Sequence, residues 1–179
     1  MSERIFVGLG SNLGDRRNYL EEAITRLAQP PDVQVVARAS LYETEPVGLG
    51  RQPWFLNTVV ELRTTRPPRA LFQLCQRIEA ELGRVKRERW GPREIDLDLL
   101  FYGERVVDEP DLQIPHPELA RRRFVLEPLA ELAPELQHPT LHRTIEELLA
   151  MVKDGKGVMR YQEGDSDRRP LARQAGGDP

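Results

Sequence analysis

Two aspartates, Asp96 and Asp98, stand within an otherwise apolar run that reads as a β-strand. Alternate side chains of a strand share a face, so the two carboxylates should lie side by side. Aspartate is depleted in strands and like charges repel, which makes the pair costly unless a cation lies between them; carboxylate oxygens suit Mg²⁺. The opposite face should carry Ile95, Leu97, Leu99 and Phe101.

A half-solvated acidic strand is the simpler interpretation of a bare Asp-x-Asp pair, but the preceding segment, residues 83–94, favours a metal site. Five basic side chains lie there together with Trp90. Arginine binds phosphate through a planar fork, and phosphoryl-type transfer depends mainly on positioning and charge neutralisation. The combination predicts a site for a magnesium-bound triphosphate; a solvated basic loop is the alternative. Trp90 could stack on a ring.

Further candidates lie elsewhere in the chain. His116, between two prolines, could donate to a phosphate oxygen, although a structural histidine is the commoner case. Phe55 and Asn57 share a strand face and could recognise a heterocycle. The glycine-rich segment 8–14 departs from a dinucleotide fingerprint, because its third glycine is one position late, and we interpret it as a tight turn. No P-loop motif occurs, so side chains must hold any ATP phosphates.

Hydrophobic periodicity and turn residues predict the elements that position these groups. Strands are expected at 5–9, 33–41, 55–63 and 95–102, helices at 16–28 and 70–82, and a short hairpin partner of the last strand around 106–107. This order predicts an α+β fold with a ferredoxin-like βαββαβ core and an antiparallel sheet. Helices at 124–132 and 140–152 should cover the second face, so that helices lie on both faces.

Length and composition predict a single domain over residues 1–153 and a polar, disordered tail over 154–179. A net charge of −3 argues against nucleic-acid binding. No apolar run approaches the roughly 20 residues that span a membrane, and no signal-peptide pattern occurs. The single cysteine, Cys75, fits a reducing compartment, so we expect a cytoplasmic monomer.

Several short motifs together resemble the hydroxymethyldihydropterin pyrophosphokinase family over about residues 4–150. They are the segments 10–14, 55–57, 83–84, 89–93, 96–98 and 115–117, and the run from Arg89 to Asp98 is the most specific. The resemblance implies that two Mg²⁺ ions bridge Asp96 and Asp98 to ATP. It also implies that the hydroxyl of 6-hydroxymethyl-7,8-dihydropterin attacks the β-phosphorus of ATP, which releases AMP and completes a step of folate biosynthesis.

The resemblance also implies residue roles. Phe55 and Phe124 should sandwich the pterin ring, and Arg84 and Arg93 should neutralise charge in catalysis beside Asp96 and Asp98. The implied pterin contacts are Thr44, Glu45, Pro46, Val47, Phe55, Asn57, Asp96, Asp98 and Phe124. The implied ATP contacts are Gln76, Glu79, Arg84, Trp90, Arg93, Leu99, Gln113, His116 and Arg122. The loops 44–53 and 83–94 are expected to close over the substrates.

This sequence departs from the family pattern at two places. The basic loop is one residue short, which leaves the equivalence of Lys86 and Arg87 open, and Arg123 replaces a small residue. Two rival functions are a related ATP-dependent transferase with another acceptor and a noncatalytic ferredoxin-like binding module. The second lacks the aromatic pattern of an RNA-binding sheet. Asp98 is a candidate general base, and no assignment follows from the sequence.

Overall fold

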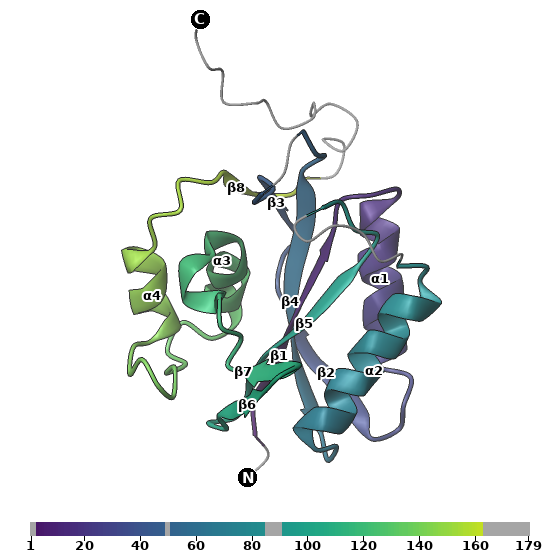
Figure 1. The fold of residues 1–179 in the computed structure, drawn as a ribbon, viewed down its shortest axis with the longest axis vertical. Helices are drawn as coiled ribbons and strands as arrows, with labels where there is room; N and C mark the ends of the chain where they lie inside the picture. The colour runs from purple at the N-terminus through teal and green to yellow at the C-terminus, as the bar shows by residue number, and fades with distance from the viewer. Residues whose placement is uncertain (1–2, 49–50, 85–90, 163–179) are drawn as a thin grey trace, which may run out of the picture.

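The computed structural model describes residues 3–48, 51–84 and 91–162, and Figure 1 shows their arrangement in three layers. The strands are β1 (Ile5–Ser11), β2 (Val33–Arg38), β3 (Tyr42–Thr44), β4 (Phe55–Thr64), β5 (Asp96–Tyr102), β6 (Val107–Glu109), β7 (Leu112–Ile114) and β8 (Val158–Arg160). The helices are α1 (Arg16–Leu27), α2 (Pro68–Glu81), the 3₁₀ turn η1 (Leu119–Arg121), α3 (Arg123–Leu132) and α4 (Ile145–Met151).

The main sheet is antiparallel and runs β5-β1-β4-β3-β8, while β2 pairs with the remaining length of β4. Helices α1 and α2 cover one face, and α3 and α4 cover the other (Figure 1). The strands β1, β2, β4 and β5 with α1 and α2 form the ferredoxin-like core, so the predicted fold class is confirmed. No helix in the described ranges is long and apolar enough to cross a membrane.

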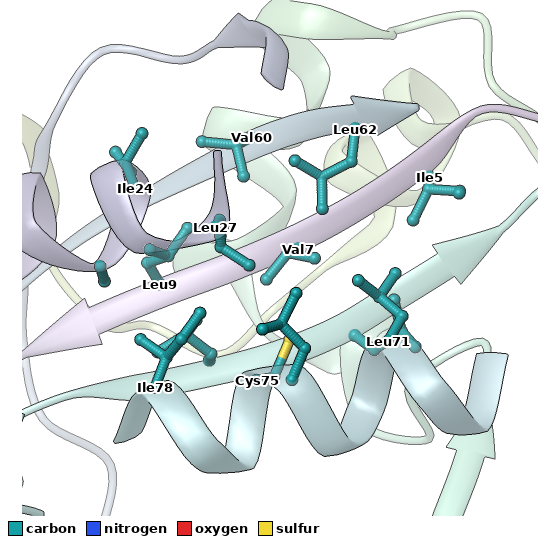
Figure 2. Close-up of a cluster of buried hydrophobic side chains, with 14 of the residues drawn as sticks. Ile5, Val7, Leu9, Ile24, Leu27, Val60, Leu62, Leu71, Cys75 and Ile78 are labelled. Carbon is teal, nitrogen blue, oxygen red and sulfur yellow. The ribbon is translucent and has the colours of Figure 1, made fainter. Parts of the chain in front are cut away.

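A buried apolar cluster lies on each face of the sheet. On the α1 and α2 face, Leu71, Cys75 and Ile78 of α2 pack against strand residues such as Val7 (Figure 2). On the other face, Phe6 packs in the second cluster with residues of α3 and α4. Because Phe6 and Val7 are adjacent in β1, alternation along one strand supplies both clusters. Burial raises the pKa of the Cys75 thiol to about 12, which fits a packing role.

A bulge in β5 corrects the predicted faces of that strand. Phe6 pairs with Phe101 while Val7 pairs with Leu99, so Leu100 is an extra residue in the ladder. Leu100 and Phe101 therefore both join the second cluster, and the prediction that Phe101 shares a face with Leu99 is wrong. The bulge lies beyond Asp98, so the two aspartates still share a face.

Two further sequence expectations also differ from the structure. The segment 107–109 does not extend β5 as a hairpin; it pairs with β7 in a separate two-stranded sheet, because only Pro110 and Asp111 separate the two strands. Helix α4 begins later than residue 140, because Thr144 forms a capping box with Glu147.

The predicted tail begins too early. Strand β8 pairs with β3, and the Tyr161 N–H donates to the Leu41 carbonyl at 2.8 Å. The edge of β3 offers backbone groups that need partners, and the short segment 158–161 supplies them. Residues 154–162 thus belong to the folded part, whereas residues 163–179 lie outside the described residues.

Candidate active site

A cavity of about 520 Å³ brings together most of the residues singled out in the sequence. Its walls come from β1, β4, β5, α2, the start of α3 and the segment that follows β3. The predicted residues that line it are Thr44, Glu45, Val47, Phe55, Asn57, Gln76, Glu79, Arg84, Arg93, Asp96, Asp98, His116, Arg122 and Phe124.

Three predicted contacts lie differently. Leu99 and Gln113 line a neighbouring cavity of about 320 Å³, which shares Phe72, Asp98 and His116 with the larger one. Pro46 is buried and lines neither of these two cavities. Trp90, Lys86 and Arg87 lie outside the described residues.

Asp96 and Asp98 lie side by side on β5, as predicted, and both line the cavity. The Asp96 Oδ1 atom is 3.0 Å from Arg84 Nη1 and 3.3 Å from Arg93 Nη1. Burial raises the pKa of each carboxyl; the charge of Asp98 adds to the rise at Asp96, while nearby arginines oppose both shifts. Two costly, half-buried carboxylates thus lie among arginines that can bind phosphate.

Glu79 connects α2 to this strand. One oxygen of its carboxylate accepts from the Leu97 N–H at 3.0 Å, between the two aspartates, and the other pairs with Arg84. Glu79 therefore fixes the strand backbone and also holds the arginine that reaches Asp96.

Asn12 connects Arg93 of the basic segment to Gln52 and Pro53 in the loop before β4. The sequence did not reveal this role. Asn12 is 1% exposed, its Oδ1 accepts from the Arg93 N–H at 2.7 Å, and its own N–H donates to the Arg93 carbonyl at 3.0 Å. Its Nδ2 donates to Gln52 Oε1 and to the Pro53 carbonyl, each at 3.1 Å. A buried asparagine with this many partners is visible only once the segments are brought together.

The interpretation of the whole segment 8–14 as a turn is wrong, because Gly8 and Gly10 lie within strand β1. At Gly10 the lack of a side chain lets Asn57 approach the backbone closely. Strand β1 continues to Ser11, and a Cβ atom on Gly10 would collide with the Asn57 side chain. The turn itself lies at Gly14, whose φ is 66°. A side chain at Gly10 would therefore displace Asn57 from the cavity wall.

His116 is a neutral donor at this site. Its Nδ1 accepts from the Glu118 N–H at 3.2 Å, which leaves the proton of the neutral ring on Nε2. Burial, assisted by the charge of Arg122, lowers the pKa of His116 to about 4. The ring can donate from Nε2 at neutral pH.

The aromatic and amide residues of the cavity lining suit a flat heterocycle. Phe55 and Asn57 lie on one face of β4, and Asn57 Nδ2 donates to Thr44 Oγ1. Phe124 lies in the first turn of α3, with the Arg122 guanidinium 5.6 Å from its ring centroid. Phe72, which sequence reasoning missed, lines both cavities and was hidden among the apolar residues of α2.

The donor set fits magnesium held jointly with a phosphate substrate. No group of three or more His, Cys, Asp or Glu side chains suited to a metal occurs in the part of the chain that the structure describes. Magnesium usually keeps waters and is held by one or two carboxylates plus substrate phosphates, which is what Asp96 and Asp98 could offer.

Fold and site together define an α+β protein in which carboxylates, arginines and aromatic rings line one cavity. The model of the family "7,8-dihydro-6-hydroxymethylpterin-pyrophosphokinase (HPPK)" matches residues 6–134. The chain belongs to this family, whose members are diphosphotransferases. It is 40% identical over 167 residues to 2-amino-4-hydroxy-6-hydroxymethyldihydropteridine pyrophosphokinase of Bacillus subtilis, covering 93% of this chain and 100% of that one. The enzyme of the same name from Methylorubrum extorquens is 44% identical over 159 residues, which cover 89% of this chain and 99% of that one.

Solved structures show the same fold. A structure described as HPPK-DHPS in complex with substrates matches with a TM-score of 0.65 at 14% identity, covering 84% of this chain and 43% of that one. A Plasmodium falciparum HPPK-DHPS structure matches with a TM-score of 0.63 at 16% identity, covering 83% and 43%. This chain thus spans less than half of those longer chains, and the likeness concerns the fold.

Proposed function

We propose that this chain transfers the diphosphoryl group of ATP to the hydroxymethyl group of 6-hydroxymethyl-7,8-dihydropterin in a magnesium-dependent reaction of folate biosynthesis. The products are AMP and the pterin pyrophosphate. The observation that carries the proposal is one cavity lined by the carboxylates of Asp96 and Asp98, by Arg84 and Arg93, and by the rings of Phe55 and Phe124. Family membership supports the reaction class.

The phosphates of ATP would lie along Arg84 and Arg93, with His116 donating from Nε2. In the structure Asp96 holds both arginines, so a triphosphate would compete with that carboxylate for them. The adjoining cavity with Leu99 and Gln113 would take the rest of the nucleotide, with Trp90 as a proposed contact. The side chains of Gln76, Glu79 and Arg122 complete the proposed ATP contacts.

The pterin would lie between Phe55 and Phe124, with Asn57, Thr44 and the backbone of residues 44–47 reading its polar edge. Stacking supplies area, while the amide and hydroxyl supply selectivity. This arrangement brings the hydroxymethyl group towards Asp96 and Asp98.

Asp96 and Asp98 would hold two Mg²⁺ ions. These ions would neutralise phosphate charge and orient the transferred group. The residues of the chain would then bind and align the substrates. Arg84 and Arg93 would offset the negative charge that leaves with AMP, and the loops 44–53 and 83–94 would exclude water that competes as acceptor.

In the transfer itself the pterin oxygen forms a bond to the β-phosphorus, and the bond from that phosphorus to the oxygen bridging the α-phosphate breaks. The bridging oxygen leaves on AMP, so the β- and γ-phosphates move together. The hydroxyl proton needs an acceptor, and Asp98, which lines the cavity, is the candidate.

The test is product identification. Purified protein with Mg²⁺, ATP and 6-hydroxymethyl-7,8-dihydropterin should yield AMP and one pterin pyrophosphate per turnover. ADP as product would contradict diphosphoryl transfer. Equal turnover with an unrelated alcohol, unaffected by Phe55→Ala and Asn57→Ala, would instead support another acceptor. A cytoplasmic location and a monomeric state stay predictions from the sequence.

A further inference from the structure

A segment after α4 reaches both walls of the proposed acceptor pocket. Figure 1 shows the chain running from α4 to β8 at the end of the sheet where β3 lies. Residues 154–157 lie on this path, between the start of α3 and the segment that follows β3. The inference drawn from them rests on the proposed function.

The first contact is at α3. The Arg123 N–H, in the first turn of α3, donates to Asp154 Oδ2 at 2.8 Å, and Phe124 follows directly. The N-cap residue of α3, Arg122, makes no side-chain capping bond, so Asp154 caps the helix from a distant part of the chain. The Lys156 N–H donates to Asp154 Oδ1 at 3.1 Å and orients the carboxylate.

The second contact is at the opposite wall. The Gly157 N–H donates to Glu45 Oε2 at 3.0 Å, and the Glu45 N–H donates to the Gly157 carbonyl at 2.9 Å. A Cβ atom on Gly157 would lie 2.9 Å from Cη2 of Trp54, the neighbour of Phe55, so the segment packs against that ring too closely for a side chain. Only two residues, Gly155 and Lys156, thus separate a contact beside Phe124 from a contact beside Phe55.

We propose that residues 154–157 form a tie that fixes the separation of the two pocket walls, with Asp154 and Gly157 as positioning residues for the pterin. Dispersion between stacked rings is short-ranged: a gap of about 0.5–1 Å removes a quarter to a half of the attraction. Loosening either end of the tie therefore weakens acceptor binding. Arg84 and Arg93, held by Asp96, Glu79 and Asn12, keep their places, so the phosphate contacts from these two arginines are unaffected.

The experiment compares Asp154→Ala, Asp154→Asn and Gly157→Ala in the full chain, with exposed Lys153→Ala as the matched control. The KM for the pterin should rise roughly tenfold to 150-fold in Asp154→Ala, the range of losing one hydrogen bond to a charged group. It should also rise in Gly157→Ala, because the added Cβ atom collides with Trp54. Asp154→Asn, which keeps an acceptor oxygen, should recover part of the loss. The KM for ATP should stay within about twofold, a change worth less than 0.5 kcal/mol.

Calorimetric titration with 6-hydroxymethylpterin gives the same comparison without turnover. Variants that lower only the melting temperature, or that raise both KM values together, would overturn the tie in favour of a general structural role. If the wild-type chain binds the pterin and all variants bind it equally well, the tie alone fails. If the wild-type chain neither binds nor converts the pterin, the proposed function fails first, and the tie fails with it.

Discussion

At the scale of single residues, the two aspartates of β5 are unfavourable for folding and central to the proposed reaction. Burial raises the pKa of both carboxyls, so each would be easier to protonate in the folded chain than in the unfolded one. Such a group opposes folding above its unfolded pKa. Its presence in a strand is explained by function, because packing gains nothing from it.

This cost gives a prediction for Asp98→Asn. Removing the charge should lower kcat by at least about 100-fold, the scale of losing one electrostatic group at a reacting centre. The free energy of unfolding at neutral pH should stay the same or rise, because the buried charge is gone. Steady-state kinetics and urea unfolding measure the two effects. A matched control is exposed Glu104→Gln, which should change neither, and a large loss of stability in Asp98→Asn would contradict the account.

His116 gives a second prediction, in its pH dependence. Its pKa is lowered to about 4 in the folded chain, so between about pH 6.5 and 4 the unfolded chain binds a proton that the folded chain does not. This residue therefore costs stability as the pH falls through that window, by at most about 3 kcal/mol. The variant His116→Asn should lose less stability than wild type between about pH 7 and 5. Urea titrations at each pH give the difference, and identical pH profiles would exclude the effect.

At the scale of elements, a buried ion pair joins α1, β3 and the start of β4. Arg16 Nη2 lies 3.3 Å from Glu43 Oε1, with side chains 15% and 3% exposed, and Arg16 Nη1 donates to the Trp54 carbonyl at 2.9 Å. The second oxygen of Glu43 has no hydrogen-bond partner in the described part of the chain. Glu43 therefore depends on Arg16.

We expect Arg16→Met to cost about 3 kcal/mol, because it leaves a buried carboxylate unpaired. Adding Glu43→Leu should recover most of that loss, since removing both charges also removes the desolvation cost. Urea unfolding of the single and double variants measures the coupling. Exposed Arg17→Met on the same helix is the matched control, with an expected change of about 0.5 kcal/mol or less. Additive effects of the Arg16 and Glu43 changes would show that the pair is not coupled.

The elements also show what the sequence could and could not predict. Periodicity predicted α1, α2 and the strands of the core, because each has one apolar face. The bulge at Leu100 was not predictable from alternation, since it depends on the register with β1. Strand β8 was missed because three residues carry little signal without the β3 edge that they complete.

The same division holds for the site. Asp96, Asp98, Arg84 and Arg93 are close in sequence and their chemistry is evident there. Asn12 and Phe72 carry no such signal, because an asparagine after a strand and a phenylalanine in an amphipathic helix are ordinary on their own. Only the tertiary structure brings them to the cavity.

At the scale of the whole molecule, the shared sheet couples the two apolar clusters. Adjacent residues of β1 supply both clusters, and so do Leu99 and Leu100 of β5. We expect one cooperative unfolding transition for the part described, because unfolding the shared sheet would disrupt both clusters at once. Leu71→Ala on one face and Leu129→Ala on the other should shift the same transition. Circular dichroism and tryptophan fluorescence should coincide in urea, and two separated transitions would contradict this expectation.

The central claim is that the carboxylate pair on β5 holds divalent metal jointly with the nucleotide. The most direct test counts bound Mn²⁺ per chain by electron paramagnetic resonance, with and without α,β-methylene-ATP, which binds as ATP would but resists cleavage. We expect two ions per chain with the analogue, fewer without it, and a loss of bound metal in Asp96→Asn and Asp98→Asn. A metal count that is unchanged in both variants would contradict the claim.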